Sequence, residues 1–252
     1  MNAITVRGCT IGTGIPKICV PIVAATIEEI AAQAQALAGK SFDIVEWRAD
    51  WFDGVFQPDA VRQAARQLRA VLGEAVPLLF TFRTRQEGGE KAISAPDYIA
   101  LNHLVASEHL ADLIDVELFT GDAAVQCVAS SAHAAGVPVI VSNHDFHQTP
   151  AQEDLVSRLC RAEQLGGDIL KIAVMPQTRA DVLTLLSATE EMSRRTSCPL
   201  ITMSMGSLGV VSRLCGETFG CALTFGTAGQ ASAPGQIDTE SLHSVLELLH
   251  GC

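Results

Sequence analysis

The sequence lacks the features of membrane, secreted and nucleic-acid-binding proteins. No stretch approaches the roughly 20 apolar residues that a membrane span needs. Basic side chains are few: 17 Lys and Arg stand against 28 Asp and Glu, a net charge of −11. Such a chain repels nucleic acid and anionic membranes, so we expect neither as a partner. The N-terminus has no charged segment followed by an apolar run, so we expect no signal peptide and a cytoplasmic protein.

Closely spaced cysteine pairs are also absent. The eight cysteines are scattered, without any Cys-x-x-Cys pair: Cys9, Cys19, Cys127, Cys160, Cys198, Cys215, Cys221 and Cys252. Disulfides remain an alternative. Because a chain of 252 residues can bury a sizeable core without covalent cross-links, we interpret the cysteines as reduced thiols.

Eight short apolar runs, rich in β-branched and aromatic residues, are typical of buried parallel strands. They begin at Lys17, Asp43, Pro77, Leu113, Val137, Asp168, Pro199 and Ala222. Helical segments lie between them, which predicts an α/β fold with a parallel sheet. Eight units, and a length near the roughly 250 residues of such barrels, favour one (β/α)8 TIM barrel over 1–252 rather than an open sheet. Residues 4–13 are expected to form a β-hairpin closing one end.

Capping patterns predict where several helices start. Thr26 with Glu29 and Thr149 with Gln152 fit capping boxes, and Pro150 stands where a first helical residue would. Ser94 with Asp97 and Thr178 with Asp181 are weaker versions of the same pattern.

Five of the predicted strands carry polar side chains on the face opposite their aliphatic residues. Alternation along a barrel strand points these side chains inward. They are Glu46 and Arg48, Thr81 and Arg83, Asp115 and Glu117, Ser142 and His144, and Lys171. A buried salt-bridge network is one interpretation. Barrel interiors are normally filled by branched apolar residues and sites lie at the C-terminal strand ends, so a functional cavity is favoured.

Lys171 and His144 are the reactive candidates. Desolvation and nearby arginines disfavour the charged form of an interior lysine, and a neutral amine can attack a carbonyl to form a Schiff base. Lasting ion pairing of Lys171 with Glu46 or Glu117 is the open alternative. His144 suits general acid/base chemistry with Glu87 orienting its ring. A zinc site with His147 is the less favoured alternative.

These residues lie in ordered blocks that resemble the type I 3-dehydroquinate dehydratases of the shikimate pathway. The blocks are EWR at Glu46, TFR and EGGE from Arg83 to Glu90, DVELF at Asp115, SNHDF at Ser142, KIAVMP at Lys171, SR at Ser212 and Arg213, and SAPGQ from Ser232 to Gln236. The resemblance spans essentially the whole chain.

The resemblance implies specific roles. Lys171 would form an imine with the C3 ketone of 3-dehydroquinate, and His144, oriented by Glu87, would move the C2 proton to the departing hydroxyl. Arg213 would hold the substrate carboxylate. Glu46, Arg48 and Arg83 would contact ring hydroxyls or polarise the site, Ser232 and Gln236 would lie on a loop closing over it, and Met203 and Met205 would supply apolar contact. The resemblance further implies no cofactor, no metal and a homodimer.

Two other functions remain. A class I aldolase also uses a lysine on the sixth strand, although most need a phosphate site after strands seven and eight. A catalytically inactive barrel could bind a metabolite as a sensor, but Lys171 and His144 are both present.

Overall fold

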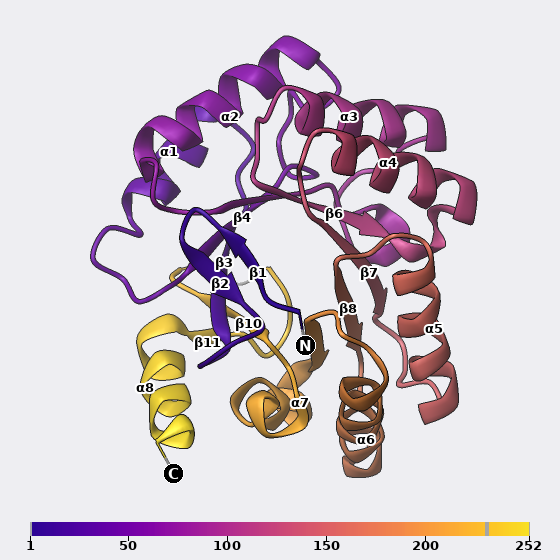
Figure 1. Ribbon diagram of the computed structural model, residues 1–252. Helices are drawn as coiled ribbons and strands as arrows, with labels where there is room; N and C mark the ends of the chain where they lie inside the picture. The colour runs from indigo at the N-terminus through magenta and orange to yellow at the C-terminus, as the bar shows by residue number, and fades with distance from the viewer. Residues whose placement is uncertain (1, 230–231, 252) are drawn as a thin grey trace.

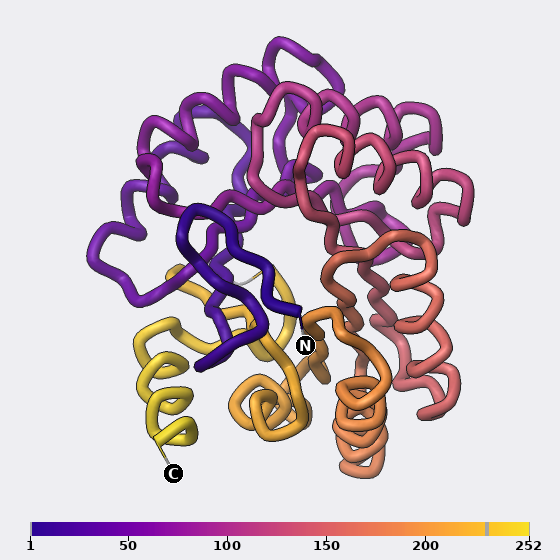
Figure 2. The backbone as a smooth tube through the Cα atoms, viewed as in Figure 1, coloured from indigo at the N-terminus to yellow at the C-terminus, as the bar shows by residue number. Residues whose placement is uncertain are grey.

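The computed structural model describes residues 2–229 and 232–251. Eight parallel strands alternate with helices and follow one another in sequence around the sheet (Figures 1 and 2). The barrel strands are β3 (Lys17–Ile22), β4 (Ile44–Arg48), β5 (Leu78–Thr81), β6 (Leu113–Glu117), β7 (Val139–Asp145), β8 (Ile169–Val174), β9 (Leu200–Ser204) and β10 (Leu223–Thr227). β10 pairs with β3, and a parallel bridge from Leu200 to Cys221 joins β9 to the start of β10. The predicted TIM barrel is confirmed.

The helices form the outer ring (Figure 1). They are α1 (Ile27–Gln35), α2 (Pro58–Leu72), α3 (Ala95–Ser107), α4 (Asp122–Ala134), α5 (Gln152–Gln164), α6 (Arg179–Arg195), α7 (Gly206–Leu214) and α8 (Thr239–His250). Short 3-10 turns η1 (Arg85–Glu87), η2 (Leu118–Thr120) and η3 (Gly216–Phe219) follow β5, β6 and α7, and β11 (Ile237–Asp238) pairs beside β10. The outward strand residues, such as Trp47, Phe80 and Val141, are buried in one core with the helices.

An N-terminal hairpin closes one end of the barrel, as predicted. It consists of β1 (Ile4–Val6) and β2 (Cys9–Ile11), joined by Arg7 and Gly8, whose φ angles of 47° and 80° are both left-handed. Such values suit the tight turns of two-residue hairpins. The hairpin crosses the end facing the viewer in Figure 1. Ile11 is fully buried there against inward residues near the strand starts, namely Cys19, Ile44, Leu79, Leu113, Ile140, Ile169, Ile201 and Leu223.

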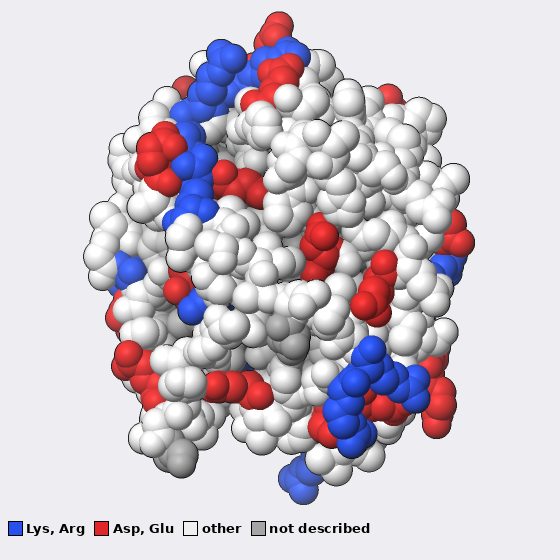
Figure 3. All heavy atoms as spheres, in the orientation of Figure 1, with Lys and Arg blue, Asp and Glu red and all other residues white. Residues whose placement is uncertain are grey.

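The surface of this hairpin face is mostly uncharged, with acidic groups scattered over it, some of them near its centre (Figure 3). A basic band runs from the hairpin toward α2. Part of it is neutralised, because Arg7 makes ion pairs of 2.7 Å with both Glu74 and Asp112. These ion pairs fix the hairpin turn to the barrel.

The helix starts agree with the sequence in three places and differ in one. Thr26 with Glu29 and Thr178 with Asp181 form complete capping boxes, and Ser94 caps α3. The prediction of a capping box at Thr149 is wrong: α5 begins at Gln152 after Ala151, and the buried Thr149 hydroxyl has no hydrogen-bond partner. The preceding segment is held elsewhere, because Gln148 O accepts from Met175 N and His147 O accepts from Gln177 Nε2. The helix therefore starts later.

Candidate active site

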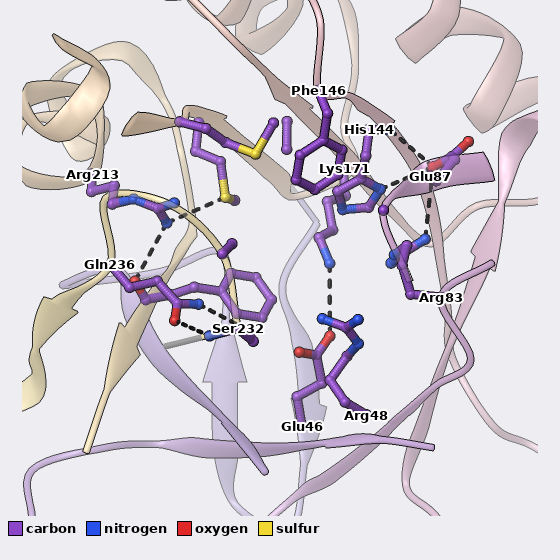
Figure 4. A pocket seen from close by; sticks show the side chains of 16 residues that line it. Glu46, Arg48, Arg83, Glu87, His144, Phe146, Lys171, Arg213, Ser232 and Gln236 are labelled. Carbon is purple, nitrogen blue, oxygen red and sulfur yellow. Dashed lines mark hydrogen bonds and ion pairs between the residues drawn. The ribbon is translucent and has the colours of Figure 1, made fainter. Parts of the chain in front are cut away.

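One pocket, with about 460 Å³ of empty volume, lies at the C-terminal ends of the strands, opposite the hairpin. The structure brings together in its walls all ten residues that the sequence singled out as catalytic or substrate-binding (Figure 4). They are Glu46, Arg48, Arg83, Glu87, His144, Lys171, Met205, Arg213, Ser232 and Gln236. Inward alternation on the strands accounts for most of these positions.

Lys171 projects from β8 into this pocket and its side chain is only 4% exposed. Its Nζ lies 3.2 Å from Asp115 Oδ2 and 3.8 Å from Glu46 Oε1. The same nitrogen lies 4.5 Å from the centre of the Phe225 ring. The sequence left open whether Lys171 lies among arginines or pairs with Glu46 or Glu117. The structure places two carboxylates in ion-pair range, Glu46 and, in place of Glu117, Asp115.

Asp115 is shared between Lys171 and Arg83. Arg83 Nη2 donates to Asp115 Oδ1 at 2.8 Å, and Arg83 Nη1 donates to Glu117 Oε1 at 2.9 Å and to Ser142 Oγ at 3.0 Å. Burial alone would raise the pKa of Asp115, but Arg83 and Lys171 outweigh it and bring that pKa below its usual range. Asp115 is therefore a fixed negative charge beside the lysine.

His144 and Glu87 form the second reactive pair. His144 Nδ1 lies 2.9 Å from Glu87 Oε2, and the backbone N–H of His144 donates to the same oxygen at 2.9 Å. This contact leaves Nε2 on the side of the ring toward Lys171 (Figure 4). Glu87 follows β5 on the turn η1, so the pair joins two neighbouring parts of the barrel rim.

Both members of this pair are biased toward their neutral forms. Burial lowers the pKa of His144 well below its usual value, and the positive charges of Arg83, Lys171 and Arg48 lower it further. Burial and the nearby Glu117 raise the pKa of Glu87 to about 8, against the opposing effect of Arg83.

Arg48 is held rigidly by a carboxylate that the sequence did not single out. Its Nε and Nη2 donate to the two oxygens of Asp50, both at 2.8 Å. Asp50 also accepts from the backbone N–H of Glu90 at 3.1 Å. This fork geometry fixes the guanidinium plane at the pocket wall. It also ties the Glu87–Glu90 segment to the end of β4.

Arg213 stands on the opposite wall from Lys171 (Figure 4). It is 1% exposed, and among the described residues it has no carboxylate in ion-pair range. Its contacts are weak: Nη1 lies 3.4 Å from Met203 Sδ and from Phe225 O, Nη2 lies 3.3 Å from Pro234 O, and Nε has no partner. Burial lowers its pKa to about 10, so it stays cationic at neutral pH. A buried unpaired cation is costly unless it binds an anion.

Ser232 and Gln236 lie on the loop that follows β10. Ser232 N donates to Gln236 Oε1 at 2.9 Å, and Gln236 Nε2 lies 3.1 Å from Ser232 Oγ. These two bonds close the segment 232–236 into a compact turn beside Arg213. Met205 follows β9 directly and is the N-cap residue of α7, rather than lying within the strand. Its side chain supplies apolar wall together with Met203.

Asp50, Asp115, Phe146 and Phe225 line or support the pocket, and the sequence patterns predicted no role for them. Asp115 was placed on the inward face, and its position opposite Lys171 was the available signal. Asp50 follows Arg48 by two residues, but a strand pattern does not indicate a bidentate pair beyond the strand end. Phe146 and Phe225 line the pocket, and Phe146 stacks near His144 with ring centres 6.5 Å apart. Apolar residues at strand ends carry no sequence signal that separates wall from core.

Residues 2–229 and 232–251 contain no group of three or more His, Cys, Asp or Glu that could hold a metal ion. In the same residues no helix is both long and apolar enough to cross a membrane. The seven cysteines in the described residues are free thiols, and Cys252 lies outside the described residues.

Comparisons with known proteins show the family of this chain. Residues 18–252 match the family model described as type I 3-dehydroquinase. The chain is 51% identical over 251 residues to the 3-dehydroquinate dehydratase of Salmonella agona, covering 99% of both chains. It superimposes with a TM-score of 0.96 on the type I 3-dehydroquinate dehydratase of Clostridium difficile (51% identity, 99% of this chain and 98% of that chain) and on the 3-dehydroquinate dehydratase of Geobacillus kaustophilus (39% identity, 99% and 97%). The chain therefore belongs to the type I 3-dehydroquinase family of hydro-lyases.

Proposed function

We propose that this enzyme dehydrates 3-dehydroquinate to 3-dehydroshikimate through an imine at Lys171. One observation carries the proposal: the buried amine of Lys171 faces a buried guanidinium, that of Arg213, across one pocket, and this guanidinium has no carboxylate partner among the described residues. A substrate with a ketone at one end of a ring and a carboxylate at the other matches that arrangement. Arg213 takes the carboxylate in a two-point contact, which places the ketone at Lys171.

The first stage forms the imine. The Lys171 amine, after passing its proton to a base in the pocket, attacks the C3 carbonyl carbon, and the resulting carbinolamine loses water. The protonated imine keeps one positive charge at the nitrogen, as in the original ammonium. Asp115 and Glu46, at 3.2 Å and 3.8 Å from Nζ, stabilise that charge throughout. The carboxylates therefore support the intermediate and do not lock the lysine out of the reaction.

The second stage is the elimination. The protonated imine withdraws electrons from C2, so the neutral imidazole of His144 can remove a C2 proton. Nε2 of His144 accepts it because Glu87 holds Nδ1 on the other side. The electron pair of the resulting enamine then expels the C1 hydroxyl, to which His144 returns the proton, and water leaves. Hydrolysis of the conjugated imine frees the product and restores Lys171.

The remaining walls hold the ring. Arg48, fixed by Asp50, and Glu46 offer polar groups to ring hydroxyls. The Arg83 guanidinium is already engaged by Asp115, Glu117 and Ser142, so we assign it an electrostatic effect on the site rather than a leading contact. Ser232 and Gln236 close over the bound ring, and Met205 contacts its apolar edge.

The relatives support this proposal. The structure of the Clostridium difficile relative, 51% identical to this chain, holds covalently modified comenic acid. A ligand covalently modified in so similar a protein is in keeping with a nucleophile in the pocket. Lys171 is the amine placed to act as one here.

Turnover of 3-dehydroquinate tests the proposal directly, since the product has a conjugated enone absorbance. Borohydride reduction during turnover should add ligand mass to the peptide that contains Lys171. The other three lysines, Lys17, Lys40 and Lys91, serve as internal controls. Carbon–carbon cleavage in place of the enone would instead indicate the class I aldolase. Absence of any adduct at Lys171 would exclude the imine mechanism.

We further propose that the enzyme serves the shikimate pathway in the cytoplasm, with 1–252 folding as one domain and assembling as a homodimer. The seven free cysteines of the described residues suit a reducing compartment. Exposed apolar side chains on α7 and α8, Leu208, Val211 and Leu249, offer surface for association. Sedimentation at several protein concentrations tests the dimer, and a single cooperative unfolding transition tests the one-domain assignment.

A further inference from the structure

Asn143 is a polar residue on the face of β7 that otherwise meets the helices. Its neighbours on that face, Val139 and Val141, are buried in the core beneath the outer helices, and Asn143 itself is only 3% exposed. A buried amide needs partners for its donors and its acceptor. α5 lies outside β7 and β8 (Figure 1), and one of its arginines supplies a partner.

The contacts of Asn143 connect α5 to the catalytic pair. Arg158 Nη1 donates to Asn143 Oδ1 at 2.9 Å. Asn143 Nδ2 donates to Glu87 Oε1 at 3.3 Å. The other oxygen of Glu87 is the one that holds His144 Nδ1. Three successive contacts thus join Arg158 to the imidazole, none of which needs the substrate.

The arginine determines which way the amide points. A guanidinium has only donors, so it can accept no hydrogen bond from an amide NH2 group. Arg158 therefore favours the orientation with Asn143 Oδ1 toward itself and Nδ2 toward Glu87. Without Arg158 the amide could rotate and present Oδ1 to Glu87. That rotated form pairs well only with a protonated carboxyl group.

The amide orientation bears on the imidazole. Glu87 receives an N–H from Asn143 on Oε1 and a backbone N–H from His144 on Oε2, and both bonds favour its carboxylate form. An unprotonated Glu87 accepts from Nδ1–H and leaves the Nε2 lone pair free. A protonated Glu87 could donate to Nδ1 and place the imidazole proton on Nε2. Only the first arrangement can remove a proton from the substrate.

We propose that Arg158, acting through Asn143, is a positioning residue that favours the form of Glu87 that accepts a hydrogen bond from His144 Nδ1–H, and thereby the His144 tautomer with a free Nε2. This inference rests on the proposed dehydration. It assigns a role in that reaction to a residue on an outer helix, which contacts neither the substrate nor the imidazole.

The groups around the pair set the background for a pH test. Glu87 faces His144 on β7, Arg83 at the end of β5 and Glu117 on β6, and His144 also feels Lys171 and Arg48. On its own helix Arg158 is paired with Asp154 at 2.7 Å, and its guanidinium lies 5.4 Å from the centre of the Phe119 ring. Replacing Arg158 leaves all the groups that face Glu87 directly in place.

The experiment measures kcat/KM from pH 6 to 9.5. Arg158→Met keeps the aliphatic stem and removes the donors, Arg158→Lys keeps a donor, and Asn143→Asp is isosteric and keeps the Arg158 contact but has no N–H for Glu87. Loss of one charge-assisted hydrogen bond should shift the acidic limb of the kcat/KM profile to higher pH by about one unit. Arg158→Met should then lose about tenfold in kcat/KM at pH 7 and recover toward wild type at pH 9.5. The acidic limb should shift further in Asn143→Asp and less in Arg158→Lys.

The matched control is Arg161→Met, one turn along α5. Arg161 binds Asp122 on the surface, with Nε 3.0 Å from Oδ1, and should leave the profile unchanged. An unshifted acidic limb in both Arg158→Met and Asn143→Asp, or a loss equal at every pH, would overturn the proposal.

A second readout separates this inference from the dehydration itself. Nitrogen NMR of His144 reports its tautomer without turnover: wild type should show Nδ1–H at pH 9, and Arg158→Met should reach that state only at higher pH. If wild type fails to dehydrate 3-dehydroquinate while this shift is present, the proposed function fails and the positioning role stands. Identical tautomer titrations would refute the positioning role alone.

Discussion

The Nζ atom of Lys171 lies 3.2 Å from Oδ2 of Asp115, a carboxylate that is fully buried and also bound by Arg83. The negative charge of Asp115 faces both Lys171 and Arg83. Each of these two cations therefore keeps this counter-charge when the bonding of the other one changes. The amine can become an imine while its negative neighbour stays in place.

Lys171→Ala should abolish turnover, lowering kcat by several orders of magnitude, because no other amine lines the pocket within the described residues. Substrate binding should survive in weakened form, since Arg213 and Arg48 remain. Steady-state rates and calorimetric titration measure the two effects. Near-normal rates in this variant would refute the imine mechanism.

His144→Ala should stall the elimination while imine formation continues slowly. General acid/base groups typically contribute about 10²- to 10⁴-fold, and we expect a loss in that range. Mass spectrometry after borohydride should show the reduced adduct accumulating. His147→Ala, three residues along, is the control and should keep full activity, since the described contacts of His147 are made by its backbone. An undiminished rate in His144→Ala would remove the residue from its assigned role.

Glu87→Gln should stabilise the fold at alkaline pH. The pKa of Glu87 is raised to about 8, chiefly by burial. The native state therefore binds more protons than the unfolded state between the ordinary carboxyl pKa and 8, and stability falls as pH rises through that window. Gln does not ionise, so the Tm difference between variant and wild type should be small at pH 4.5 and grow toward pH 8.5, on the order of a few degrees. A pH-independent difference would contradict the assignment.

Arg213→Met should separate stability from binding. Removing a buried cation that has no carboxylate partner among the described residues should raise the Tm of the ligand-free protein. The same change should raise KM about tenfold to a hundredfold, because charge-assisted bonds to the substrate carboxylate are lost. Thermal unfolding with and without 3-dehydroquinate measures both. A lowered Tm with unchanged KM would show that Arg213 is structural.

Gly89→Ala should damage the loop that carries Glu87. A Cβ at position 89 would lie 1.9 Å from Arg83 O and 3.0 Å from Asp50 Oδ2, so the backbone would have to move. We expect a loss of stability of about 1–3 kcal/mol and a larger loss of activity. Gly229→Ala, whose added Cβ would meet nothing within 4 Å among the residues that the structure describes, is the matched control. Unaltered unfolding of Gly89→Ala by denaturant would contradict this prediction.

Strand periodicity was enough to predict the barrel and most of the pocket. Inward alternation placed Glu46, Arg83, His144 and Lys171 correctly, because a barrel strand has only two faces. The start of α5 could not be read in the same way, since Thr149 and Gln152 have the right spacing but the backbone at His147 and Gln148 bonds to the segment after β8. The link from Arg158 to Glu87 was equally hidden, because it depends on how far a side chain reaches between α5 and the barrel rim.

The hairpin gives the barrel the form of a cup. With Ile11 buried among the strand starts, the interior opens toward solvent at the rim where the segment 232–236 lies. Substrate, product and the water consumed in hydrolysis then pass through the same opening at this rim. Stiffening that rim should therefore slow entry and exit together, and it would cap the rate of the whole cycle even with the chemistry intact.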